Sequence, residues 1–157
     1  MGNLLKSQVA VFLSGTIFAY YTVYQDFRRF YFYEGTIFKL KNCTIPNPVT
    51  TACFYGSFAF LMGLIMSLII LKNFRAKKSI IKLQKYLLFL TEFAFVFAWT
   101  NFSLIFYKYL KTSSGTFIGC SGVKALSPFL TPCFYGSVIF TISLFLVFYI
   151  KKRLTKV

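Results

Sequence analysis

The sequence predicts an all-α membrane protein, with four transmembrane helices in one bundle built from two tandem helix–loop–helix repeats. Its composition is the first reason. Of 157 residues, 57% are hydrophobic and 13% are charged, with a mean hydropathy of +0.67, whereas soluble domains carry about 25% charged residues. Four apolar segments also alternate with basic clusters, and one seven-residue segment occurs twice. A chain with so few charges is expected to lie in lipid.

The repeated segment predicts a tandem duplication. Residues 51–57 read TACFYGS and residues 131–137 read TPCFYGS, with six identities in seven positions. We place repeat one at 1–79 and repeat two at 80–157, within a single transmembrane domain of 1–157. Each repeat holds two spans, so both copies have the same orientation about a pseudo-twofold axis along the membrane normal. The same offset aligns three further pairs: Pro48 with Pro128, Phe60 with Phe140, and Lys72 with Lys152.

The first repeat contains two predicted spans. The first covers about 8–24, enough for a short crossing at about 1.5 Å per residue. Residues 25–49 follow as an outer loop that begins with mixed charged and aromatic residues, as interfacial segments do. The second span, about 53–71, contains no charged residue.

The second repeat follows the same plan. Residues 72–85 connect the repeats and hold six basic residues and no acidic one. The third span covers about 86–107, an outer loop covers 108–132, and the fourth span covers about 133–150. Small residues allow helices to approach closely in lipid. We therefore assign helix packing to eight of them: Gly15, Ala19, Gly56, Ala59, Gly63, Ala94, Ala98 and Gly136.

The distribution of basic residues predicts the topology. Both termini and the connection 72–85 should be cytoplasmic, since that side then holds eleven of the eighteen Lys and Arg residues. Arg28 and Arg29 in the first outer loop run against this rule. The clusters 72–85 and 151–156 should bind anionic lipids. We assign the net charge of +15 to these roles and not to nucleic-acid binding. The Lys-, Ile-, Phe- and Tyr-rich composition is compatible with an AT-rich bacterial genome, so we place the protein in a bacterial inner membrane.

The four cysteines all fall outside the cytoplasm in this topology: Cys43, Cys53, Cys120 and Cys133. An even number, two in each repeat, predicts two disulfide bonds. Four cysteines allow three connectivities, and the repeat favours Cys43–Cys53 with Cys120–Cys133. Each bond would close a loop of about ten residues and stabilise it by about 2–3 kcal/mol. The first functional hypothesis is therefore a non-catalytic scaffold or complex subunit, without a cofactor, that contacts other membrane proteins or further copies of itself.

The second hypothesis is thiol–disulfide exchange. Cys53 and Cys133 each begin a span, where a helix N-terminus lowers the pKa of a thiol. In length, span number and cysteine placement the chain resembles the four-helix membrane thiol oxidoreductases of the DsbB and vitamin K epoxide reductase types, although it lacks their Cys-x-x-Cys motif. The resemblance implies that electrons pass from a partner's dithiol through one cysteine pair to the other and then to a quinone. Cys53 or Cys133 would lie next to the quinone, and Cys43 or Cys120 would be the shuttle.

Polar residues inside the third span give a third hypothesis, a small transporter or channel. Glu92 is either a proton relay or a structural residue paired with Lys85 near the interface. Asn101 is expected to bond between helices. The sequence contains no histidine, which excludes histidine bases and histidine metal sites, and we predict no metal site.

Overall fold

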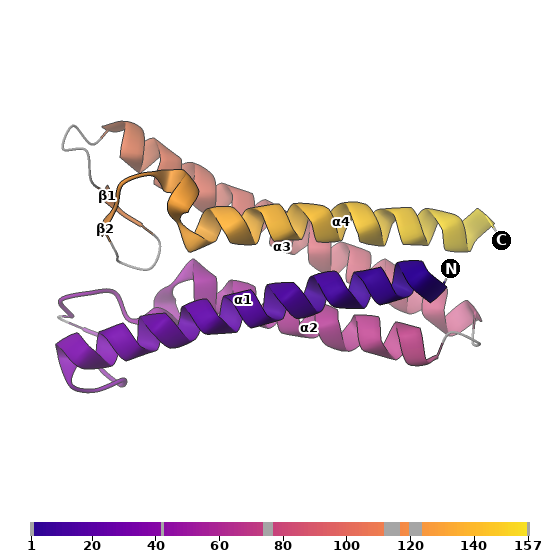
Figure 1. Ribbon diagram of the computed structural model, residues 1–157, viewed down its shortest axis with the longest axis horizontal. Coiled ribbons are helices and arrows are strands. Elements are labelled where there is room, and N and C mark those ends of the chain that lie inside the picture. Colours follow the sequence, from indigo (N-terminus) through magenta and orange to yellow (C-terminus); the bar gives the residue numbers. More distant parts are fainter. Residues whose placement is uncertain (1, 42, 74–76, 112–116, 120–123, 157) are drawn as a thin grey trace.

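The structure is a computed structural model that describes the chain except for residues 1, 42, 74–76, 112–116, 120–123 and 157. Long helices dominate the described part (Figure 1): α1 (Gly2–Glu34), α2 (Ala52–Lys72), α3 (Lys77–Lys111) and α4 (Pro132–Lys156). Short 3-10 turns precede α2 and α4, namely η1 (Pro48–Thr50) and η2 (Pro128–Leu130). Two short strands, β1 (Phe117–Ile118) and β2 (Lys124–Ala125), pair antiparallel with Phe117 opposite Ala125. The prediction of an all-helical protein is confirmed.

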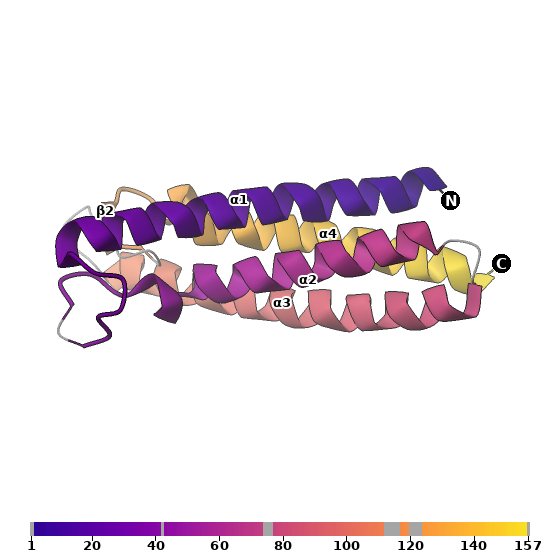
Figure 2. The ribbon, with the colours of Figure 1, turned by 90° about the horizontal axis from the view of Figure 1, so that it is seen from below.

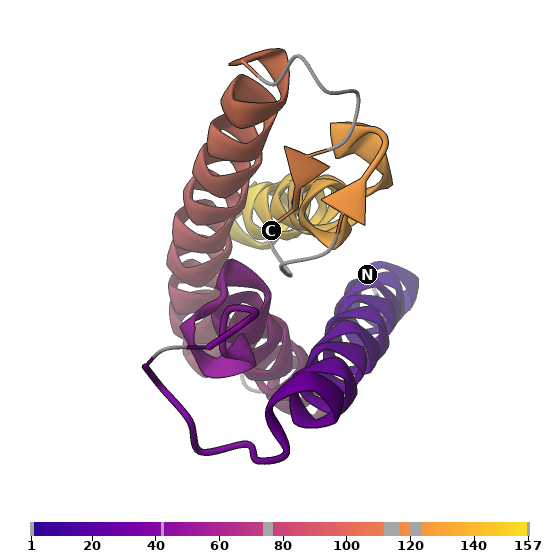
Figure 3. The ribbon, with the colours of Figure 1, turned by 90° about the vertical axis from the view of Figure 1, so that its left-hand side faces the viewer.

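The helices form a closed ring. α1 packs mainly against α2 and α3 mainly against α4, while contacts between α2 and α3 and between α1 and α4 complete the ring. Figure 3 shows this arrangement from one end. Both termini lie at the same end of the bundle as the end of α2 and the start of α3, and the strands and 3-10 turns lie at the opposite end (Figures 1 and 2).

Within the described residues, three helical segments are long and apolar enough to cross a membrane: Ala52–Lys72, Ser79–Lys111 and Pro132–Thr155. They contain the predicted spans 53–71, 86–107 and 133–150, as expected of an integral membrane protein. α1 is not among these segments, because glutamines, threonines and tyrosines interrupt its apolar run. The predicted span 8–24 therefore stays a prediction.

Three helices are several residues longer than the sequence predicts, and one of them is α4, which continues to Lys156 beyond its expected end at about 150. α1 continues through 25–34, which we expected to begin the outer loop, and it ends at Glu34, immediately before Gly35. The φ of Gly35 is +68°, the left-handed conformation in which glycine commonly closes a helix. α3 begins within 72–85, which we expected to be a connection. Ile80 and Gln84 are almost fully buried there, so a periodic inner face turns this lysine-rich segment into helix.

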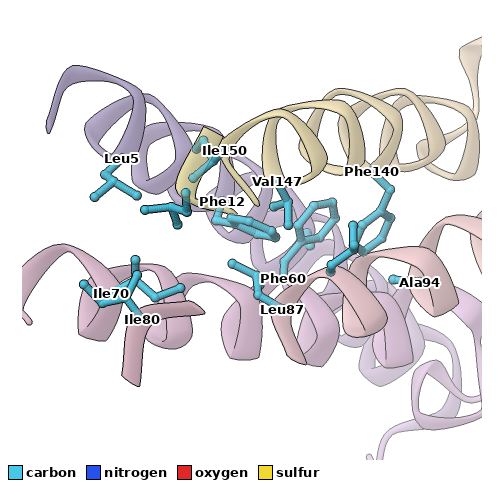
Figure 4. Close-up of a cluster of buried hydrophobic side chains, with 13 residues drawn as sticks. Leu5, Phe12, Phe60, Ile70, Ile80, Leu87, Ala94, Phe140, Val147 and Ile150 are labelled. Atoms are coloured by element: carbon cyan, nitrogen blue, oxygen red, sulfur yellow. The ribbon is translucent and has the colours of Figure 1, made fainter. Parts of the chain in front are cut away.

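Stacked aromatic rings fill the middle of the bundle (Figure 4). The rings of Phe60 on α2 and Phe140 on α4 are parallel within 7°, with centroids 3.9 Å apart. Two glycines make room for the aromatic side chains. A Cβ atom added at Gly15 would lie 2.5 Å from Phe60 Cε1, and one added at Gly63 would overlap the ring of Phe12. The centre of the bundle is therefore closed by side chains.

Hydrogen bonds between buried side chains join all four helices in the half of the bundle nearer the termini. Gln84 Nε2 donates to Gln8 Oε1 at 2.9 Å and to the backbone oxygen of Val147 at 3.2 Å. Gln8 Nε2 donates to Ser67 Oγ at 3.1 Å. Such bonds between membrane helices contribute about 0.6 kcal/mol each on average. We did not predict roles for Gln8 or Gln84, although both fall where the 3–4 spacing of apolar residues calls for an inward side chain.

Candidate functional site

Cys53 and Cys133 lie in the first turns of α2 and α4, at the end of the bundle opposite the termini. Both line one cavity of about 50 Å³ between the helices. The other lining residues come from corresponding places in the two halves of the chain. At offsets of 79 or 80 they form these pairs: Phe18 with Phe97, Ala19 with Ala98, Thr22 with Asn101, Ala52 with Pro132, Gly56 with Gly136 and Phe60 with Phe140.

The same local structure positions both cysteines. Pro48 and Pro128 each begin a 3-10 turn, where the fixed φ of proline suits the first position of a helical turn. The hydroxyl groups of Thr51 and Thr131 donate to the carbonyl oxygens of Pro48 and Pro128, at 2.7 Å and 2.6 Å. Both threonines have extended backbones, and the long helix begins at the next residue. Each cysteine therefore lies three residues after the end of a 3-10 turn.

The two cysteines also share one packed cluster. Cys133 is 9% exposed and packs with Ile105, and Cys53, Tyr109 and Ala125 pack against this pair. Both side chains lie at helix N-termini, where unpaired N–H groups and the helix dipole favour negative charge. The arrangement brings together one cysteine from each predicted disulfide pair.

The predicted bond between Cys43 and Cys53 is absent, since neither residue is disulfide-bonded. Cys43 lies in the first loop, where its S–H donates to the carbonyl oxygen of Lys39 at 3.3 Å. Cys53 belongs to the interior cavity, so the two side chains have different surroundings. Cys120 lies outside the described residues, and the pair Cys120–Cys133 stays a prediction.

Hydrogen bonds hold the first loop in place of that disulfide. The Glu34 carboxylate accepts from Lys39 Nζ at 2.5 Å and from the backbone N–H of Thr44. Asn47 Nδ2 donates to the carbonyl oxygens of Ile37 and Lys39, at 3.3 Å and 2.9 Å. The hydrogen bond from Lys39 holds the pKa of Glu34 below its ordinary value, and the same bond raises the pKa of Lys39.

Glu92 lies away from the cavity, on the outward side of α3. It is exposed there beside Phe89 and Phe93, which are 71% and 67% exposed. In the described part of the chain, no ion pair joins Glu92 to Lys85. The structure therefore lacks both the expected ion pair and an interior position for a relay. Sequence alone did not reveal this, because one carboxylate in an apolar run does not say which side of the helix is buried.

Asn101 does line the cavity, but its Nδ2 donates to the carbonyl oxygen of Phe97 in its own helix, at 2.7 Å. In the part of the chain that the structure describes, the expected bond from Asn101 to another helix is not formed. Another residue makes a bond of that kind on α3, where Trp99 Nε1 donates to Thr141 Oγ1 of α4 at 3.0 Å. We predicted no role for Trp99, because a single tryptophan in a span lies at the membrane surface as often as it lies inside a bundle.

The small residues predicted to pack helices occupy two kinds of place. Most of them are buried or lie against the core: Gly15, Ala19, Ala59, Gly63, Ala94 and Ala98. Gly56 and Gly136 line the cavity, and a Cβ atom added at either would meet nothing within 4 Å. Gly56 and Gly136 therefore leave space beside the cysteines.

Among the residues that the structure describes, no three His, Cys, Asp or Glu side chains are grouped so as to hold a metal ion. No family model, curated protein or solved structure matches the chain.

Proposed function

We propose that the protein is a four-span membrane protein that carries out thiol–disulfide exchange. One observation carries the proposal: Cys53 and Cys133 line the same cavity and pack in the same cluster. Exchange between two cysteine pairs requires that a sulfur of one pair reach a sulfur of the other. Disulfides that only fastened two separate loops would not require the two helix starts to meet.

The proposed exchange has two steps. The Cys53 thiolate attacks the Cys133 sulfur of a Cys120–Cys133 disulfide, which forms a Cys53–Cys133 bond and releases the Cys120 thiolate. The Cys43 thiolate then attacks Cys53, which forms a Cys43–Cys53 bond and releases Cys133. Two electrons and two protons thus pass from the first cysteine pair to the second. A partner's dithiol would reduce Cys43–Cys53 again, and a quinone would reoxidise the other pair.

The position of Cys43 suits the shuttle role in this scheme. Its side chain is partly exposed in the first loop, outside the helix bundle, so a partner protein can approach it. The cavity of about 50 Å³ is smaller than the roughly 300–1,000 Å³ of small-molecule sites. A quinone would therefore accept electrons either at the outer surface of the first turns of α2 and α4 or between these turns after they move apart.

The proposal includes α1 as the fourth span. α1 packs along α2 and α4, and Gln8 and Thr22, two of the polar residues in its apolar run, are buried inside the bundle. Leu13 and Ile17 are exposed on its other side, where lipid would cover them. The paired cavity residues support a duplication, and an even number of spans would put both termini in the cytoplasm and the cysteine end outside.

The redox behaviour of the cysteines tests the function. The purified protein is equilibrated at graded dithiothreitol or glutathione potentials, and free thiols are alkylated and counted by mass spectrometry. We expect one pair to reduce readily and to reoxidise when quinone is added, because structural disulfides lie below roughly −300 mV. The C53S and C133S variants should abolish transfer between the pairs, whereas C43S should still permit a Cys53–Cys133 bond. Failure of quinone or partner dithiol to change any thiol count would refute the proposal.

A non-catalytic scaffold is the second candidate, and the packing of the interior favours it. Phe60 and Phe140 stack in the middle of the bundle, and both are almost fully buried. The hydrogen bonds of Glu34 and Asn47 order the first loop without a disulfide. The same closed interior counts against the third hypothesis, a transporter or channel through the bundle. Redox-inert cysteines in the alkylation experiment would leave the scaffold as the better explanation.

A further inference from the structure

A groove of about 500 Å³ lies between α1 and the segment that leads from β2 into α4. It is separate from the cysteine cavity, although Phe18, Thr22 and Pro132 line both. Its volume falls within the roughly 300–1,000 Å³ of small-molecule sites. The groove is therefore large enough for part of an amphiphilic molecule.

An arginine in this groove has an N–H group without an acceptor. Arg29 Nη2 donates to Asp26 Oδ1 at 3.2 Å, and the Asp26 side chain is 4% exposed. Arg29 Nη1 is buried but has no hydrogen-bond partner in the described part of the protein. A buried N–H group without an acceptor is costly, so a ligand that supplied an oxygen atom here would be favoured.

The groove combines two cations and one carboxylate, that of Asp26, with an apolar wall. Lys124 lines it as a second cation beside Arg29, and Phe18, Leu126 and Leu130 supply apolar surface. Arg29 is also one of the basic residues that run against the positive-inside rule, so topology does not explain it. An arginine fork suits phosphate oxygens, and the adjacent apolar surface suits a hydrocarbon chain.

We propose that this groove binds an anionic phospholipid. Arg29 and Lys124 hold the phosphate, and the start of an acyl chain lies against Phe18, Leu126 and Leu130. The site lies at the end of the bundle opposite both termini, whereas the clusters 72–85 and 151–156 belong to the other end, where α2 and α4 end and α3 begins. Lipid binding at this site does not depend on thiol chemistry, so its test is independent of the test of the proposed function.

Native mass spectrometry of the full-length protein in detergent tests the site, with phosphatidylglycerol or phosphatidylcholine added. We expect one tightly held phosphatidylglycerol molecule in the wild-type protein and about tenfold weaker binding of it in R29Q, since one charge-assisted hydrogen bond is lost. Phosphatidylcholine should bind far more weakly. R28Q is the matched control, because it removes the same charge from the neighbouring position and does not line this groove.

R29Q leaves Asp26 buried without its cation, so a second variant guards against misfolding. D26N/R29Q removes both charges, so it should fold and still lose the lipid. K124Q should weaken lipid binding without any second substitution. Glycerol phosphate without acyl chains should not compete, whereas competition by it would indicate a site for soluble phosphates and overturn the lipid proposal. Equal phosphatidylglycerol binding by the wild-type, D26N/R29Q and K124Q proteins would also overturn it.

Discussion

Two glycines decide how closely α1 and α2 approach. Gly15 faces the ring of Phe60, and Gly63 faces the ring of Phe12. Phe60 cannot swing aside, because its other side stacks on Phe140. We expect G15A and G63A each to destabilise the protein by about 1–3 kcal/mol, as overpacked cores do. Unfolding in mixed detergent and sodium dodecyl sulfate, followed by circular dichroism, measures this.

Gly136 provides the matched control for that experiment. It is also a helical glycine, but a Cβ atom there would meet nothing within 4 Å. G136A should therefore be neutral or stabilise by up to about 1 kcal/mol, since alanine favours helix more than glycine does. Equal destabilisation by all three variants would contradict the assigned contacts.

The first loop is an element whose order depends on one carboxylate. The pKa of Glu34 is lowered from 4.5, first by the hydrogen bond from Lys39 and then by that from Thr44. A lowered pKa means that the ionised form stabilises the folded loop, so this contribution is present above about pH 4.5 and is lost as pH falls through the lower folded value. We expect residues 35–47 to exchange amide hydrogens faster at about pH 3 than at about pH 6, after correction for the intrinsic rate.

The E34Q variant separates this effect from general acid unfolding. It should show the faster exchange of the first loop already at about pH 6, while α2 and α4 stay protected. The contribution of Lys39 to stability depends on pH in the opposite direction, because the pKa of Lys39 is raised from 10.5. Its contribution is present below that value and is lost as pH rises through the higher folded pKa. Unchanged protection of the loop in E34Q would show that Asn47 alone holds it.

The arrangement of the whole bundle predicts on which side of the membrane each loop and terminus lies. Both termini lie at one end, and the first loop lies at the other (Figure 2). If α1 crosses the membrane, single cysteines introduced by N3C and K39C into a cysteine-free protein should be labelled from opposite sides by an impermeant maleimide. A cysteine introduced by T155C should be labelled from the same side as N3C. Labelling of N3C and K39C from one side would remove α1 from the set of spans.

Composition and local pattern were enough to predict the class of the protein and most of its segments. Low charge and long apolar runs require helices in lipid, because an unpaired backbone group in hydrocarbon costs several kcal/mol. The repeat of Cys53 and Cys133 with their flanking prolines also predicted equivalent helix starts. These features depend on residues close together in the chain, so local propensity and hydropathy predict them well.

Which side chains face one another became clear only from the packing of the helices. Glu92 points outward, Gln8 and Gln84 meet inside, and Cys53 lies with Cys133 while Cys43 stays in the loop. The packing of all four helices sets these contacts, and it depends on how side chains such as Phe60, Phe140, Gly15 and Gly63 fit together. Packing is a property of several helices at once, so no single segment of the sequence encodes it.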